Sequence, residues 1–149
     1  MHYLRIVTGL QKYYICFMEK QIINTDAAPA PIGPYNQAVR IGDLLFVSGQ
    51  IPMDAQTGEL INTGIAAETK KVMENLKAIL DAAKLNFSHV VKSSIFLTDM
   101  AQFAAMNEVY GQYFADNAPA RECVQVAALP KGVQVEISVI ASAKVSSAW

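Results

Sequence analysis

An arginine and a cysteine near the C-terminus are the first residues whose types and spacing suggest chemistry. Arg121 and Cys123 stand two positions apart in the β-prone run 120–126, so they share one face of a strand, while Val124 and Val126 share the other. A guanidinium presents a rigid fork of donors that matches a carboxylate. The run therefore indicates either a site for a small anion or an edge strand with a surface arginine beside an acidic neighbour.

Cys123 and Glu136 each admit a chemical and a structural interpretation. The charge of Arg121 favours a thiolate at Cys123, which would make it a nucleophile. A small buried filler is the commoner role for such a cysteine, and no histidine lies nearby to act as its base. Glu136 interrupts an otherwise apolar strand, so its carboxylate is either solvated or held in a cleft where it could activate water.

Four further positions are candidate ligand contacts with ordinary alternatives. Tyr35 follows the stiff turn 31–34, which would fix its phenol for hydrogen bonding, although a packing tyrosine fits as well. Ser48 and Gly49 end an apolar strand, where a glycine lets a ligand approach the backbone closely. Asn107 lies among alanines in a helix, where a solvent-facing position is the alternative. None of these residues decides the function alone.

Composition and charge limit the class of protein. The 149 residues are 52% hydrophobic and 17% charged, which suits a single domain with a substantial core. The net charge of −1 lacks the concentrated basic footprint of a typical nucleic-acid binder. No stretch approaches the roughly 18 apolar residues of a membrane span, and Gln11 and Lys12 interrupt any secretory signal. We therefore expect a cytoplasmic protein.

No cofactor or metal is expected from the residue pattern. The two cysteines and two histidines, at positions 2, 16, 89 and 123, are too scattered for a metal-ligand motif. The turns 57–60 and 130–132 are not phosphate loops, and a Gly-rich nucleotide fingerprint is absent from the sequence.

The expected elements follow the order β-β-β-α-β-α-β-β. Strands are predicted at 19–25, 37–41, 44–51, 89–97, 121–129 and 133–145, and helices at 65–83 and 100–114. The first helix is supported by an apolar stripe of Ile65, Thr69, Val72, Leu76, Ile79, Leu80 and Ala83. Much of its polar side is covered by Lys70, Lys71, Glu74, Asn75, Lys77 and Asp81. Asp99 with Gln102 resembles a capping box that opens the second helix. Strands in hairpin-like pairs favour an α+β fold, a mixed sheet with two helices on one face.

The last predicted strand alternates in polarity. One face carries Val133, Val135, Ile137, Val139 and Ala141, and the other carries Gln134, Glu136, Ser138, Ile140 and Ser142. We expect the first face to meet the helices. The second, mixed face could meet another subunit.

Four segments of the chain form a specific combination of motifs. They are APAPIGPYNQAV (28–39), FVSGQIP (46–52), the ENLKAIL helix and PARECVQVAALPKGVQVEISVIA (119–141). Together they resemble the Rid family of reactive intermediate deaminases, also known as the YjgF or L-PSP family. The resemblance runs from about Met18 to about Lys144, nearly the whole chain.

The resemblance implies a chorismate-mutase-like α+β fold, a homotrimer, and ligand sites in the clefts between subunits. Archetypal members hydrolyse 2-imino acids to 2-keto acids and ammonia, chemistry that needs neither metal nor covalent nucleophile. Carried over by motif, Arg121 would clamp the substrate carboxylate, helped by the Cys123 backbone amide, and Glu136 would activate the attacking water. The pocket would be lined by Tyr35, Ser48, Gly49 and Asn107.

The chain departs from the family pattern in three places. The loop 115–121 looks shorter than in many relatives, which often carry an aromatic residue before the PAR motif. Because this loop would line the pocket, the resemblance does not predict which substrate side chain is preferred. Asn36 stands where serine is frequent, with little expected effect. Residues 1–17 precede the usual start of the family. Three explanations stay open for them: an upstream start-site artefact, an added strand or a real addition. Residues 18–149 form the expected single domain.

Two other functions stand beside imine hydrolysis. One is a trimeric protein that binds small keto or amino acids without turnover, and the other is the ribonuclease activity that gave the family one of its names. The presence of both Arg121 and Glu136 favours catalysis, because binding alone would not require the carboxylate. The missing basic surface and the lack of a histidine-based acid/base pair argue against RNA cleavage.

Overall fold

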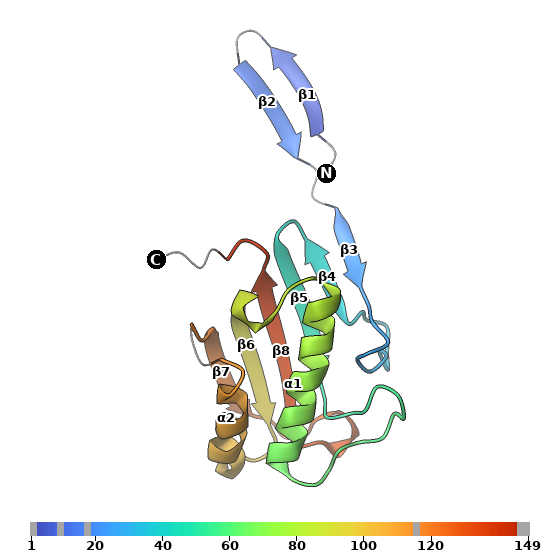
Figure 1. Cartoon of the computed structure of the whole chain (residues 1–149), viewed down its shortest axis with the longest axis vertical. Helices are drawn as coiled ribbons and strands as arrows, with labels where there is room; N and C mark the ends of the chain where they lie inside the picture. Colours follow the sequence, from blue (N-terminus) through green and yellow to red (C-terminus); the bar gives the residue numbers. More distant parts are fainter. Residues whose placement is uncertain (1–2, 9–10, 17–18, 115–116, 146–149) are drawn as a thin grey trace.

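The computed structural model describes residues 3–8, 11–16, 19–114 and 117–145. Within them, a six-stranded sheet in the order β3-β4-β5-β8-β6-β7 carries two helices on one face (Figure 1). The strands are β3 (Lys20–Ile23), β4 (Ala38–Ile41), β5 (Leu44–Gln50), β6 (Val90–Leu97), β7 (Ala120–Gln125) and β8 (Val135–Ser142), and the helices are α1 (Ile65–Ala82) and α2 (Phe103–Gly111). The predicted α+β fold, with two helices on one face of a mixed sheet, is confirmed.

Neighbouring strands in this sheet run antiparallel, except that β6 and β7 run parallel. Helix α2 lies between β6 and β7 in the chain and provides the crossover that a parallel pair requires. The predicted short hairpin connects β4 and β5, where Ile41 pairs with Leu44 across Gly42-Asp43. Gly42 has a φ of 56°, a left-handed conformation that glycine adopts without strain.

The segment predicted as an N-terminal extension contains two strands. β1 (Tyr3–Thr8) and β2 (Gln11–Cys16) pair antiparallel in a sheet of their own, separate from the six-stranded sheet. The boundary predicted between residues 17 and 18 lies outside the described residues, so it stays a prediction.

The apolar stripe of α1 faces the sheet as predicted. Its seven members are all buried: Ile65, Thr69, Val72, Leu76, Ile79, Leu80 and Ala83. Asn75, which the sequence placed on the polar side, is only 1% exposed. Its amide donates to the main-chain carbonyls of Ile51 (3.1 Å) and Met53 (3.0 Å), and these two bonds compensate for its burial. The prediction for Asn75 was therefore wrong.

Strand β8 alternates between a buried and a half-buried face, as its sequence indicated. The five residues predicted to meet the helices are all buried in the core: Val133, Val135, Ile137, Val139 and Ala141. Within the described part of the chain, no helix lies against the opposite face of the sheet (Figure 1). That face exposes large apolar side chains, namely Ile22, Ile41, Leu44, Phe46 and Val124.

The second helix is shorter than predicted. Asp99 does cap a helical turn, accepting from the Ala101 N–H at 2.8 Å, but this is the 3₁₀ turn η2 (Met100–Gln102) that precedes α2. Gln102 does not complete a capping box, because its side-chain amide donates instead to Gln134 Oε1 at 2.7 Å. Tertiary contacts have replaced a local one, and the capping-box prediction is corrected accordingly.

Several strand ends also differ from the prediction. His89 belongs to the 3₁₀ turn η1 (Phe87–His89), where it forms a capping box with Asn86, and β6 begins one residue later. β7 ends at Gln125, and the 3₁₀ turn η3 (Pro130–Gly132) follows it. β8 begins at Val135 because the Gln134 N–H donates to the buried Glu68 carboxylate at 2.9 Å, which removes that group from strand pairing.

Candidate functional site

An open cleft of about 340 Å³ lies beside β5 and β8. We call it the Glu136 cleft, and it is lined by Ile32, Tyr35, Ser48, Gly49, Ile51, Pro130 and Glu136. Four residues that the sequence predicted for one site are thus brought together here: Tyr35, Ser48, Gly49 and Glu136. They come from the loop before β4, the end of β5 and the start of β8.

A bulge at the end of β5 makes room for the Glu136 carboxyl group. Val47 pairs with Val139 and Gln50 with Ile137, so β5 carries one more residue than β8 over this stretch. A Cβ on Gly49 would lie 1.9 Å from Glu136 Oε1 and 2.7 Å from its Cδ. The glycine therefore holds the space that the carboxyl group occupies.

We expect Gly49→Ala to displace the Glu136 carboxyl group with little effect on folding. The atoms that must move are the end of a flexible side chain, so the free energy of unfolding should change little. A misplacement of about 1 Å in a reacting group costs about 10²-fold in rate. The measurements are steady-state kinetics of the hydrolysis that the family resemblance implies, and urea unfolding.

The matched control is Gly111→Ala at the end of α2, where a Cβ would meet nothing within 4 Å. Full activity in Gly49→Ala would contradict the role of this glycine.

Burial shapes the electrostatics of the Glu136 cleft. Glu136 is half-buried, and this desolvation raises the pKa of its carboxyl group. The Ser48 hydroxyl donates to the Asn36 carbonyl at 2.7 Å, which fixes the serine against the loop that carries Tyr35. A carboxylate with a raised pKa beside an open cleft is typical of a general base.

The loop that carries Tyr35 is held by a buried glutamine that the sequence reasoning missed. Gln37 is 2% exposed, and its side-chain amide donates to the carbonyls of Thr25, Ala28 and Pro29 at 2.9–3.0 Å. Its Oε1 accepts from the Thr25 N–H at 2.6 Å. The only hint in the sequence was a polar residue at the start of the predicted strand 37–41.

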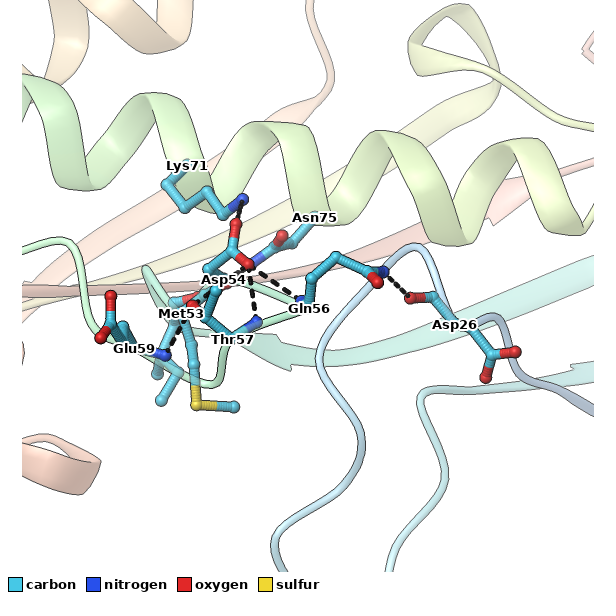
Figure 2. Close-up of polar contacts among 9 residues, drawn as sticks. Asp26, Met53, Asp54, Gln56, Thr57, Glu59, Lys71 and Asn75 are labelled. Atoms are coloured by element: carbon cyan, nitrogen blue, oxygen red, sulfur yellow. Dashed lines mark hydrogen bonds and ion pairs between the residues drawn. The ribbon is translucent and has the colours of Figure 1, made fainter.

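The loop after β5, which supplies Ile51 to the cleft, is fastened to α1 by polar contacts (Figure 2). Asp54 accepts from Lys71 Nζ at 2.8 Å and from the N–H groups of Gln56 and Thr57 at 2.9–3.0 Å. These bonds, the lysine first, hold the pKa of the Asp54 carboxyl group well below its usual value. Asn75 holds the start of the same loop, as described above.

We expect Asp54→Asn to destabilise the protein at neutral pH more than at acid pH. Because the folded-state pKa of Asp54 is lowered, its contribution to stability is full above the ordinary pKa of 3.8 and is lost as the pH falls through the folded value. Urea unfolding of wild type and variant between pH 7 and pH 3 should therefore show a shrinking difference.

Asp81→Asn is the control for Asp54→Asn, because Asp81 pairs with Lys77 on the exposed surface of α1. A difference for Asp54→Asn that does not vary with pH would contradict the assigned role.

Arg121 lies on the helix-covered face of the sheet, where it contacts the predicted Asn107 and two aromatic residues that the sequence did not single out. Arg121 Nη1 donates to Asn107 Oδ1 at 2.7 Å, and its Cζ lies 5.6 Å and 5.0 Å from the ring centroids of Phe103 and Tyr110. We call these four residues the Arg121 cluster. Asn107 thus contacts Arg121. This contact does not test whether either residue lines a substrate pocket, so both roles stay predictions.

Cys123 shares the face of Arg121, as predicted. Its side chain is half-buried against the core, and this burial raises the pKa of its thiol, with Arg121 opposing the shift only in part. A raised pKa keeps the thiol protonated at neutral pH, which disfavours the nucleophile interpretation. The half-buried side chain fits the alternative of a small packing residue better, and the predicted role of the Cys123 backbone amide stays a prediction.

Arg121 and Glu136 lie on opposite faces of the sheet in one chain. Arg121 pairs with Ser93 and Glu136 with Phe96, and residues three apart on β6 point to opposite sides. One chain therefore does not bring the guanidinium and the carboxylate into the same pocket. It presents two half-sites, the Glu136 cleft and the Arg121 cluster.

Among residues 3–8, 11–16, 19–114 and 117–145, no group of three or more His, Cys, Asp or Glu side chains is placed to hold a metal ion. Over the same part of the chain, neither helix has the length and apolar character needed to cross a membrane.

Comparison with known proteins gives the family. The family model described as Endoribonuclease L-PSP matches residues 25–143. The chain belongs to the Rid (YjgF/L-PSP) family. The match covers five of the six strands of the main sheet, β4 to β8, together with both helices and both half-sites. It confirms the resemblance drawn from the sequence motifs.

Named relatives of this Rid-family chain are similar over nearly their whole lengths. It is 53% identical over 126 residues to Protein DfrA of Myxococcus xanthus, covering 83% of this chain and 96% of that one. It is 46% identical over 122 residues to the human 2-iminobutanoate/2-iminopropanoate deaminase, covering 82% and 89%. The solved structure of E. coli TdcF with bound serine matches with a TM-score of 0.79 at 46% identity, covering 82% of this chain and 98% of that one.

Proposed function

We propose that this protein hydrolyses reactive 2-imino acids to 2-keto acids and ammonia. The observation that carries the proposal is the Glu136 carboxyl group, half-buried beside an open cleft in space that Gly49 leaves free. The names of the human and rat relatives, both 2-iminobutanoate/2-iminopropanoate deaminases, support the same reaction. The serine bound to the E. coli structural relative supports a site for a small molecule with a carboxylate.

The reaction follows from the chemistry of the two half-sites. Arg121 holds the substrate carboxylate, which orients the electrophilic C=N carbon. Glu136 accepts a proton from the attacking water as its oxygen bonds to that carbon. The carboxylic acid returns this proton to the nitrogen, which gives a carbinolamine. Glu136 then takes the hydroxyl proton of the carbinolamine and passes it to the amine nitrogen, so that the C–N bond breaks as the C=O bond forms and ammonia leaves. Water supplies the oxygen of the 2-keto acid, and the glutamate ends unprotonated as it began.

We further propose that a complete site forms between two subunits of a homotrimer, with the Glu136 cleft from one subunit and the Arg121 cluster from its neighbour. The opposite orientation of the two half-sites in one chain supports this arrangement. So does the exposed apolar surface on the helix-free sheet face. β7 is the last strand of the sheet, so one side of its backbone near Cys123 is free to meet a ligand or a neighbour.

The test couples the purified protein to an amino-acid oxidase, with semicarbazide trapping the free imine. The proposal expects imine to disappear faster than in buffer, and no acceleration by the wild type would refute it. A light-scattering mass near three times the 16.2 kDa chain mass is expected, whereas a monomer would exclude the composite site. RNA cleavage that persists in Arg121→Ala and Glu136→Gln would point to the ribonuclease alternative.

A further inference from the structure

The guanidinium of Arg121 sits in an aromatic setting that sequence reasoning did not identify. Its Cζ lies over the rings of Tyr110 at 5.0 Å and Phe103 at 5.6 Å, both within the range of cation–π attraction. Phe103 is the first residue of α2, and Tyr110 follows it by seven positions, so the two rings lie on one face of the helix. Arg121 itself is exposed, and a long exposed arginine without such contacts would sample many rotamers.

The Tyr110 ring is itself fixed in place. Tyr110 is 4% exposed, and its hydroxyl donates to Ser93 Oγ at 3.0 Å inside the core. Burial raises the pKa of this phenol, so its proton stays available for that bond. Ser93 is the residue paired with Arg121 across β6 and β7, which ties the aromatic ring to the same strand position as the arginine.

Asn107 completes the setting by accepting from one nitrogen of the guanidinium, Nη1, at 2.7 Å. A guanidinium carries five N–H donors, so most remain for a carboxylate. The two rings and the amide together restrict the orientation of the guanidinium plane before any ligand arrives. Ordering the arginine in advance removes an entropy cost from binding.

We propose that Phe103 and Tyr110 are positioning residues that orient Arg121 for the substrate carboxylate. The inference rests on the proposed function and deepens it, since it assigns carboxylate affinity to an aromatic cradle as well as to the arginine. Neither ring touches the reacting carbon in this scheme. Their effect should therefore fall on binding and leave the chemical step unchanged.

The test compares Phe103→Leu with Phe103→Tyr, because Phe103 is only partly buried and its replacement should leave the fold intact. One exposed cation–π contact corresponds to about a two- to fivefold change in affinity. Phe103→Leu is expected to raise KM for the imino acid by that factor with kcat unchanged. Phe103→Tyr, which keeps the π face, should restore KM.

A binding arm uses calorimetric titration of 2-oxobutanoate and of its neutral amide, 2-oxobutanamide. Phe103→Leu should weaken binding of the charged ligand about two- to fivefold and leave the neutral one unchanged. Phe87→Leu is the matched control, because Phe87 packs against Tyr113 and Phe114 and, among the described residues, lies next to Arg121 only through Phe114 and Tyr110.

The outcomes separate the two proposals. If the wild type accelerates imine loss but Phe103→Leu has the same KM and the same 2-oxobutanoate affinity, the positioning role of the aromatic residues is refuted and the deaminase proposal is retained. If Phe103→Leu and Phe87→Leu lose affinity equally, or both ligands weaken together, the role of Phe103 is only structural. If Phe103→Leu weakens 2-oxobutanoate binding as expected but the wild type hydrolyses no imine, the positioning role is supported and the deaminase proposal is refuted.

Discussion

Glu136→Gln is expected to lower kcat for imine hydrolysis by about 10²- to 10⁴-fold, the usual contribution of a positioned general base. The amide keeps the size and much of the hydrogen bonding of the carboxyl group but cannot accept a proton from water. Binding of a 2-keto acid should change little, because Arg121 holds its carboxylate. The measurements are single-turnover kinetics with semicarbazide trapping and titration of 2-oxobutanoate.

The pH dependence of the wild type follows from the same group. Only the unprotonated carboxylate can act as base, so activity falls as the pH drops through its pKa. Burial raises that pKa above the ordinary value of 4.5, so the acidic limb of kcat/KM should lie above the position of an exposed glutamate. In Glu136→Gln this limb should vanish from the residual rate.

Stability supplies the control for Glu136→Gln. Because the folded-state pKa is raised, the wild-type fold is favoured while Glu136 is protonated and loses that contribution as the pH rises through the folded value. The glutamine variant should therefore be at least as stable as the wild type at pH 8, with the difference shrinking toward pH 4. Near-wild-type kcat in a folded Glu136→Gln would remove Glu136 from the mechanism.

Arg121→Ala is expected to lower kcat/KM by about 10²- to 10³-fold, since it removes charge-assisted hydrogen bonds to the substrate carboxylate. The side chain is exposed, so the free energy of unfolding should change little. Arg121→Lys keeps the charge but loses the planar fork of donors, and it should recover only part of the activity. Steady-state kinetics and 2-oxobutanoate titration check both variants.

Arg40→Ala is a matched control for the arginine. Arg40 also lies on a strand of the main sheet, but its Nε donates to the Gly42 carbonyl at 3.2 Å, away from both half-sites. Its replacement should leave KM unchanged. Equal losses in the Arg40 and Arg121 variants would show that charge or stability, and not carboxylate recognition, causes the effect.

Most of the fold prediction came from the periodic spacing of apolar residues along single helices and strands. The stripe of α1 and the alternation of β8 both come from the geometry of a single element, which repeats with a fixed period and meets the core on one side. The sharing of a face by Arg121 and Cys123 has the same origin. These features needed no knowledge of neighbouring elements.

Element ends and buried polar groups escaped prediction because distant partners determine them. Gln102 was expected to cap its own helix and instead bonds to Gln134, which lies 32 positions away. Asn75 and Gln37 look like surface residues in the sequence, yet each satisfies carbonyls of a loop that only the fold brings near. A local pattern contains no information about such partners.

By itself, the sequence determined the α+β class, the order of the main-sheet elements, the core faces and the family. It also named the polar residues that now line the Glu136 cleft and the Arg121 cluster. Only the tertiary structure decided that Gly49 makes space for Glu136, that aromatic rings flank Arg121, and that the two charged groups occupy opposite sheet faces. Those facts depend on strand register and on a one-residue bulge, which arise between elements and leave no period in the chain.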